Sequence, residues 1–174
     1  GFYRINQTST RDVDGNKLTA NYNEGIAYNY KSISGYTSDP DRNQLLFMKQ
    51  MGYAIGGDVM NVVNTSVLGA DSILGVKYVL SSYDIPGLKK LENIEPGNGK
   101  SVYYNPYALP VAFTYESSNM LPDSEEKDEF LYQNQLFSYL SGQNVQVNKR
   151  IEAEPKADSN TVGYDVKHMD DPVY

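Results

Sequence analysis

The stretch DSILGVKYVLSS, residues 71–82, determines most of the fold expected for this chain. Residues 70–74 have the composition of a short helical turn, which Gly75 ends. From Val76 to Ser81 apolar and polar side chains largely alternate, and this period is typical of a β-strand. A helical turn that runs directly into a largely buried strand predicts helices packed on a sheet.

Two further segments have the features of longer helices. In the first, residues 39–51, Asp39 is expected to cap the N-terminus and Pro40 to occupy the first helical position. The second follows an acidic run and is expected from about Asp128 to Ser141, since carboxylates favour the positive end of the helix dipole. A glycine follows each segment and is expected to end it. The buried faces predicted for these helices consist of Leu45, Leu46, Met48 and Met51, and of Phe130, Leu131, Phe137 and Leu140.

Alternating segments before and after these helices predict the remaining strands. Residues 2–8 predict an opening strand. Residues 101–118 predict a strand pair that is interrupted at Asn105-Pro106 and at Leu109-Pro110. The expected fold is therefore α+β, with a mixed β-sheet on which two principal helices pack. We expect one domain over residues 1–142, followed by a trailing β-rich segment, residues 143–174, which is either packed on that domain or truncated.

Composition excludes several classes of function. The chain of 174 residues carries a net charge of −7 and lacks cysteine, so disulfides, thiol catalysis and zinc–thiolate sites are ruled out. It has no basic stripe of the kind that binds nucleic acid. No run approaches the roughly 20 apolar residues that a membrane span requires. The sequence starts at Gly1 without an initiator Met, and we expect a water-exposed domain cut from between or beside the membrane spans of a larger protein.

The residues that usually perform catalysis are not arranged for it. His168 is the only histidine and has no serine or cysteine in a suitable context, so a catalytic triad has little support. A site with two histidine ligands cannot form within the chain. The glycine-rich segments lack the spacing of phosphate-binding loops. The sequence therefore predicts no catalytic residue, no metal site and no cofactor.

Five segments, in their order along the chain, carry a resemblance to a known family. They are FYRI (2–5), ISGYTS (33–38), DSILGVKYVLSS (71–82), YYNPYALPVAF (103–113) and QNQLFSYLSG (133–142). Together they resemble the extracytoplasmic region of the bacterial YfhO family of multi-pass membrane proteins. The resemblance implies a location on the extracytoplasmic face of the cell membrane. It also implies a GT-C-type glycosyltransferase that moves sugars from a polyprenyl-phosphate donor to a cell-wall polymer such as lipoteichoic acid in Gram-positive bacteria.

The resemblance assigns no catalytic residue to this chain, because the family's catalytic acid is expected in an early loop between membrane helices. The hypothesis is that the domain positions the acceptor, with the parent protein's transmembrane helices and the polymer glycan as partners. A phosphate-rich acceptor would need a local basic patch. The adjacent basic pairs are Lys89–Lys90 and Lys149–Arg150, for which a solvated surface is the competing interpretation.

Four residues are candidates for glycan contact: Tyr36, Tyr103, Asn105 and Tyr107. They combine aromatic faces and an amide close to backbone that proline interrupts. A structural cluster of tyrosines is the alternative interpretation. Two other functions remain open. A non-catalytic scaffold or protein-docking domain would show a large exposed apolar patch. A secreted hydrolase would show a pocket with converging carboxylates of perturbed pKa.

Overall fold

The computed structural model describes residues 1–8, 23–37, 39–53, 65–94, 99–116, 120–123, 126 and 128–149, together with the backbone of residues 152–155 and 164–167. The strands and helices follow one another in the order β1 (Arg4–Gln7), α1 (Glu24–Ala27), α2 (Arg42–Gln50), α3 (Leu68–Ile73), β2 (Val76–Ser81), β3 (Lys89–Lys90), β4 (Ser101–Tyr104), α4 (Glu129–Ser141), β5 (Glu152–Pro155) and β6 (Tyr164–Lys167).

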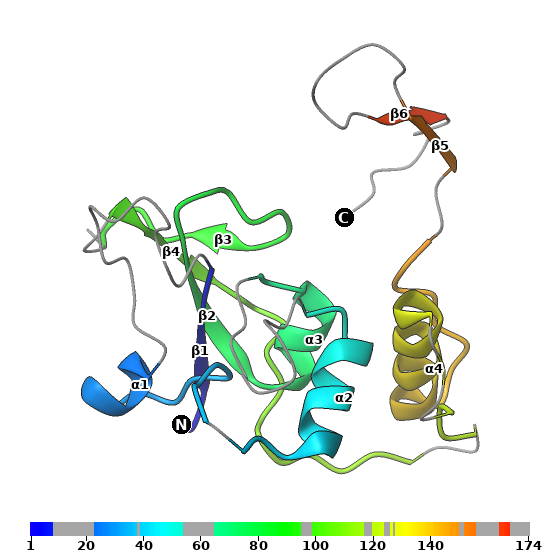
Figure 1. Ribbon diagram of the computed structural model, residues 1–174, viewed down its shortest axis with the longest axis horizontal. Helices are drawn as coiled ribbons and strands as arrows, with labels where there is room; N and C mark the ends of the chain where they lie inside the picture. The colour runs from blue at the N-terminus through cyan, green and yellow to red at the C-terminus, as the bar shows by residue number, and fades with distance from the viewer. Residues whose placement is uncertain are drawn as a thin grey trace.

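Four of the strands form one mixed sheet with the order β1–β2–β4–β3, shown in Figure 1. β1 runs parallel to β2, while β4 is antiparallel to both β2 and β3. The predicted α+β class and mixed sheet are confirmed. The longest helices are α2 and α4, the two that the sequence predicts as principal helices.

The predicted strand pair within residues 101–118 is wrong in its second half. Only residues 101–104 form a strand, and β4 pairs with β2 and β3 instead of with residues 110–116. The Asn105 amide still donates to Lys77 O (2.9 Å), but Pro106 and Pro110 have no amide hydrogen to offer a ladder. The described residues after β4 therefore leave the sheet as irregular chain.

The step from α3 to β2 has the form that the opening stretch predicts. Gly75 has a φ of +68°, which side-chain-bearing residues rarely adopt, and it turns the chain from helix to strand. Val76 and Val79 are then fully buried in the sheet core. Because α3 and β2 are consecutive and in contact, this unit fixes the helical layer against the sheet.

Helix α2 begins two residues later than predicted. Asp41, not Asp39, is the N-cap, because its side chain accepts a hydrogen bond from the Gln44 amide (2.9 Å). Pro40 consequently precedes the cap. Met48 and Met51 are buried as expected, but Leu46 is exposed.

Helix α4 begins and ends as predicted. The Asp128 carboxylate caps its N-terminus by accepting from the amides of Phe130 and Leu131 (both 3.0 Å), and Gly142 adopts a left-handed conformation after its last residue. The predicted buried face is partly wrong, since Phe130 and Leu131 are exposed. The buried residues are instead Tyr132, Gln133 and Leu136.

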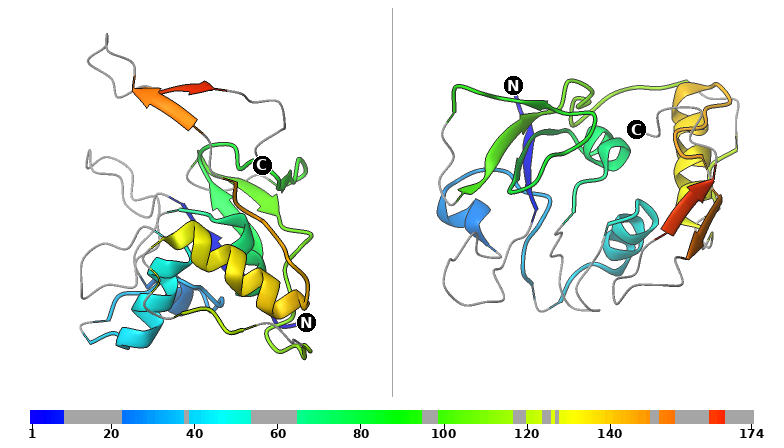
Figure 2. Two further views of the ribbon diagram at one scale, coloured as in Figure 1. Left: turned by 90° about the vertical axis from the view of Figure 1, so that its right-hand side faces the viewer. Right: turned by 90° about the horizontal axis from the view of Figure 1, so that it is seen from above.

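The core consists of two adjoining clusters. One lies among the helices and includes Met48, Met51, Ala70, Tyr132 and Leu136. The other lies against the sheet and consists of Val76, Val79, Ile85 and Tyr103. Figures 1 and 2 show α2 and α3 between the sheet and α4, so the two ends of this layered arrangement present different surfaces.

The trailing segment begins as extended chain along α4 and continues to the hairpin of β5 and β6. Its antiparallel pairing confirms a β-rich part at this end, whereas the proposed boundary at residue 142 stays a prediction. Within the part of the chain that the structure describes, every helix is too short or too polar to cross a bilayer.

Candidate functional site

Two of the four predicted glycan-contact residues are buried. Tyr103 lies in the sheet core, and its hydroxyl donates to Asp84 Oδ1 (2.7 Å). Asn105 donates from Nδ2 to Val76 O (3.0 Å) and to Ser72 Oγ (3.2 Å) and accepts at Oδ1 from the Tyr107 amide (3.0 Å). The Asn105 contacts join the end of β4 to the start of β2, and the Tyr103 contact joins β4 to the chain after β2. Both side chains therefore support the fold instead of facing solvent.

The other two candidates present their rings to solvent. Tyr107 is 61% exposed in the turn after β4. Tyr36 is exposed and its backbone is held by Asn23, which both donates to Tyr36 O (3.3 Å) and accepts from its amide (2.8 Å). Of the four predicted residues, Tyr36 and Tyr107 are therefore the two whose rings are accessible from solvent.

A row of three tyrosines, Tyr3, Tyr78 and Tyr104, crosses the sheet on the face opposite Tyr103. The ring centroids of Tyr3 and Tyr78 are 5.3 Å apart in an edge-on arrangement, and those of Tyr78 and Tyr104 are 5.9 Å apart. Tyr78 and Tyr104 are register partners on β2 and β4, which brings their side chains to the same face. We call these three residues the tyrosine row.

Lysines lie at two places along the tyrosine row. Lys77 Nζ lies 5.6 Å from the ring centroid of Tyr3 and 6.0 Å from that of Tyr78, within the range of a cation–π contact. Lys89 is the register partner of Tyr104 and is exposed at the edge strand. This site depends on strand register, which local sequence patterns do not give, although the pair Lys89–Lys90 already stands out in the sequence.

A hollow of about 420 Å³ adjoins β3 and β4. Lys90 and Lys100 line it, but the Lys100 ammonium donates inward to Gln7 Oε1 (3.1 Å). Burial lowers the pKa of Lys100, and the nearby Glu24 charge partly offsets this. Glu92 also lines the hollow, so its electrostatic character is mixed. The accessible cations at this edge are therefore Lys89 and Lys90.

Asp71 is the most buried carboxyl group and lies in a polar cluster between β1 and the helices. It accepts from Tyr53 Oη (2.6 Å), Ser66 Oγ (2.5 Å) and Asn6 Nδ2 (3.3 Å). Burial raises the pKa of Asp71 to about 6, although these hydrogen bonds act in the opposite direction. No second carboxylate is bonded to this cluster among the described residues, so the converging pair that a hydrolase needs is not formed here.

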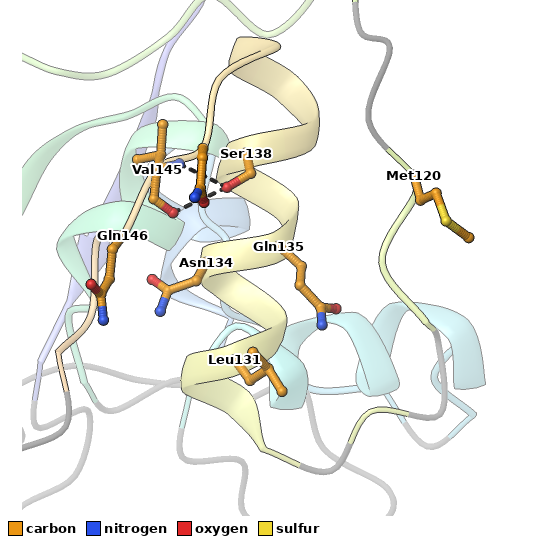
Figure 3. Close-up of a pocket in the computed structure, with 8 residues that line it drawn as sticks. Met120, Leu131, Asn134, Gln135, Ser138, Val145 and Gln146 are labelled. Atoms are coloured by element: carbon orange, nitrogen blue, oxygen red, sulfur yellow. Dashed lines mark hydrogen bonds between the residues drawn. The ribbon is translucent and has the colours of Figure 1, made fainter.

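An open groove of about 500 Å³ lies on the outer side of α4, between the helix, Met120 and the strap, which we define as residues 143–149. Asn134 and Ser138, one helical turn apart, hold the strap by hydrogen bonds to its backbone. Figure 3 shows the bonds between Ser138 and Val145. The residues that line this α4 groove are Met120, Leu131, Asn134, Gln135, Ser138, Asn144, Val145 and Gln146.

Metal binding finds no support in the described part of the chain, where no three His, Asp or Glu residues lie together as a ligand set. His168 and Arg150 lie outside the described residues, while Lys149 is exposed at the end of the strap. The basic pair Lys149–Arg150 is thus described only in part.

Comparison with known proteins gives one family. The family model described as "Bacterial membrane protein YfhO" matches residues 1–170, almost the full chain. No curated protein matches the chain, and no solved structure matches it either.

Proposed function

The chain belongs to the YfhO family of bacterial membrane proteins, and from that premise we propose that it positions the acceptor in an extracytoplasmic sugar transfer. The donor is a polyprenyl-phosphate sugar and the acceptor a cell-wall polymer such as lipoteichoic acid. The catalytic residues belong to a GT-C-type membrane part of the protein, on the outer face of the cell membrane. This chain contributes binding rather than bond breaking.

The observation that supports this proposal best is the tyrosine row with its two lysines. Aromatic rings offer flat apolar faces to sugar C–H groups, and the phenol hydroxyls bond to water or to sugar hydroxyls. Ammonium groups attract phosphate as point charges. A polymer that alternates sugars or polyols with phosphates has both features. Tyr3, Tyr78 and Tyr104 supply the rings, and Lys77 and Lys89 supply the charge.

The charge of the whole chain makes the local lysines necessary. With a net charge of −7, the chain as a whole repels a polyanion. Screening weakens this repulsion beyond roughly 8 Å at physiological ionic strength. Within that distance the nearby ammonium groups of Lys77 and Lys89 dominate. Glu92 is the acidic residue that lines the adjoining hollow, and its charge opposes binding.

The experiment is a titration of the ¹⁵N-labelled chain with fragments of a glycosylated poly(glycerol phosphate). We expect amide shifts on β2, β3 and β4, with Tyr107 and Tyr36 reporting whether the predicted positions extend the site. Lys89→Ala should weaken binding about threefold to fivefold, the effect of about 1 kcal/mol from one exposed charge. Glu92→Gln should strengthen it. Lys49→Ala, an exposed lysine in the last turn of α2, is the matched control.

The titration contradicts the proposal if neither the sheet face nor the β3 edge responds to the polymer. It also contradicts the proposal if Lys49→Ala weakens binding as much as Lys89→Ala, because the attraction would then be a general effect of charge.

A second candidate function is docking onto the membrane-embedded part of the same protein. It is favoured by an unusual run of exposed apolar side chains between β4 and the start of α4, where Phe130 is 63% exposed. These residues are Tyr107, Leu109, Val111, Phe113, Tyr115, Met120, Leu121, Phe130 and Leu131. In this case the face would be covered by the parent protein's transmembrane helices.

Because the chain lacks cysteine, single cysteines can report this contact. Phe113→Cys and Phe130→Cys should react with a polar thiol reagent in the isolated chain and be protected in the intact membrane protein. Leu46→Cys, on the exposed side of α2, should react equally in both. Equal reactivity of all three residues in both proteins would rule out docking through this face.

A further inference from the structure

The α4 groove has a lining that differs from the tyrosine row in one decisive respect, its lack of charge. None of its eight lining residues is Lys, Arg, Asp, Glu or His. Three are apolar and five carry amide or hydroxyl groups. Its volume of about 500 Å³ falls within the usual range of roughly 300 to 1,000 Å³ for small-molecule sites. An uncharged ligand of a few rings fits both its size and its electrostatics.

The strap forms one wall of the groove, and the backbone of Val145, Val147 and Asn148 is already bonded to α4. Asn134 Oδ1 accepts from the amides of Val147 (2.9 Å) and Asn148 (2.8 Å), while its Nδ2 donates to Asn148 O (2.9 Å). Ser138 Oγ accepts from the Val145 amide (2.9 Å) and donates to Val145 O (3.0 Å). An incoming peptide would therefore find no open backbone edge to extend at these positions.

The side-chain amides of Gln135, Asn144 and Gln146 are the groups that remain for a ligand. All three line the groove, and Figure 3 shows Gln135 projecting from α4 and Gln146 from the strap, on either side of Asn134. A primary amide offers two donor hydrogens and an acceptor oxygen, which can pair with two neighbouring hydroxyl groups of a sugar ring.

Apolar side chains line part of the groove, and two aromatic rings lie outside its lining. Met120, which is 90% exposed, and Leu131 line it beside Gln135. Tyr139 lies one turn after Gln135 on the same side of α4, and its ring packs edge-on against Tyr115 with centroids 5.3 Å apart. Such surfaces cover the C–H faces of a sugar while the amides bind its hydroxyls.

We propose that the α4 groove binds a short neutral saccharide. The proposal does not depend on acceptor binding at the tyrosine row, because it rests on a different surface. Figures 1 and 2 show α2 and α3 between α4 and the sheet, so a ligand at one surface need not touch the other. Since no lining residue is charged, binding is expected to be insensitive to salt, in contrast to binding of a phosphate polymer at Lys89.

The test is a titration of the ¹⁵N-labelled chain with maltotriose, cellotriose and chitotriose, each to about 20 mM. This concentration detects dissociation constants in the millimolar range, which correspond to a binding free energy of about −4 kcal/mol. We expect at least one of them to shift the side-chain amide signals of Gln135, Asn144 and Gln146. Gln135→Ala and Gln146→Ala should each weaken binding by about fivefold, the loss of one or two neutral hydrogen bonds. Gln143→Ala removes an exposed amide of the strap that does not line the groove, and it should leave binding unchanged.

Three results would overturn this inference: no response of these amides to any of the three sugars, equal weakening by Gln143→Ala and Gln146→Ala, or a response to an uncharged peptide with none to the sugars. Lys89→Ala should weaken binding of the phosphate polymer, but the amide shifts that the neutral sugars cause in the α4 groove should stay the same. Failure at one site can therefore be told from failure at the other.

Discussion

Replacement of Asp71 by Asn should remove a specific dependence of stability on pH. The carboxyl group is fully buried, and desolvation raises its pKa from 3.8 to about 6. An acid whose pKa is higher in the folded than in the unfolded state binds its proton more tightly when folded. Its contribution to stability is therefore complete below about pH 3.8 and is lost as the pH rises through about 6.

The size of this effect follows from the shift. A difference of just over two pH units, from 3.8 to about 6, corresponds to roughly 3 kcal/mol of unfolding free energy. Asn is nearly isosteric with Asp and cannot ionise. It can still accept from the Tyr53 hydroxyl and donate to Ser66 Oγ, so the cluster of hydrogen bonds is largely kept.

The assay is urea denaturation followed by circular dichroism at several values between about pH 3 and pH 7. The unfolding free energy of Asp71→Asn, relative to the unsubstituted chain, should rise by roughly 3 kcal/mol across this range. Leu46→Ala, which removes no ionisable group and changes an exposed side chain, should run parallel to the unsubstituted chain. A constant difference between Asp71→Asn and the unsubstituted chain at every pH would refute the reasoning.

Other substitutions test the fold itself. Asp128→Ala removes the N-cap of α4 and should lower the unfolding free energy by about 1 kcal/mol, measured by urea denaturation. Gly75→Ala should cost more, about 2 kcal/mol, because φ is +68° and the new Cβ would lie 3.0 Å from Leu109 O; no loss would contradict the turn. Val79→Ala, at a fully buried position, should cost about 2 kcal/mol and show a lower thermal midpoint, whereas Leu46→Ala on the exposed side of α2 should change little.

Local signals in the sequence were sufficient for most of the fold. The alternation of Val76 to Ser81, the cap at Asp128 and the left-handed Gly142 are each properties of a few neighbouring residues. The errors arise where packing decides. Phe130 is an apolar residue on the exposed side of α4, whereas the side that carries Tyr132 and Leu136 faces the core. A helix with apolar residues on several sides does not reveal which side is buried.

The candidate site was less accessible to prediction for a related reason. Tyr103 and Tyr104 are adjacent and chemically alike, but successive residues of a strand face opposite sides of the sheet. Which of the two is buried depends on whether Val79 or Tyr78 lies opposite, and that register is set by residues far apart in the chain. The amides of the α4 groove gave no signal either, because a groove forms only when the strap returns along the helix.

The measurement that tests the central claim most directly is the steady-state kinetics of sugar transfer by the intact membrane protein carrying Tyr3→Ala together with Lys89→Ala. If the domain positions the acceptor, KM for the polymer should rise about tenfold while kcat stays the same. This rise corresponds to a loss of roughly 1.4 kcal/mol of binding free energy. An unchanged KM for the polymer, with or without a loss of kcat, would contradict the account.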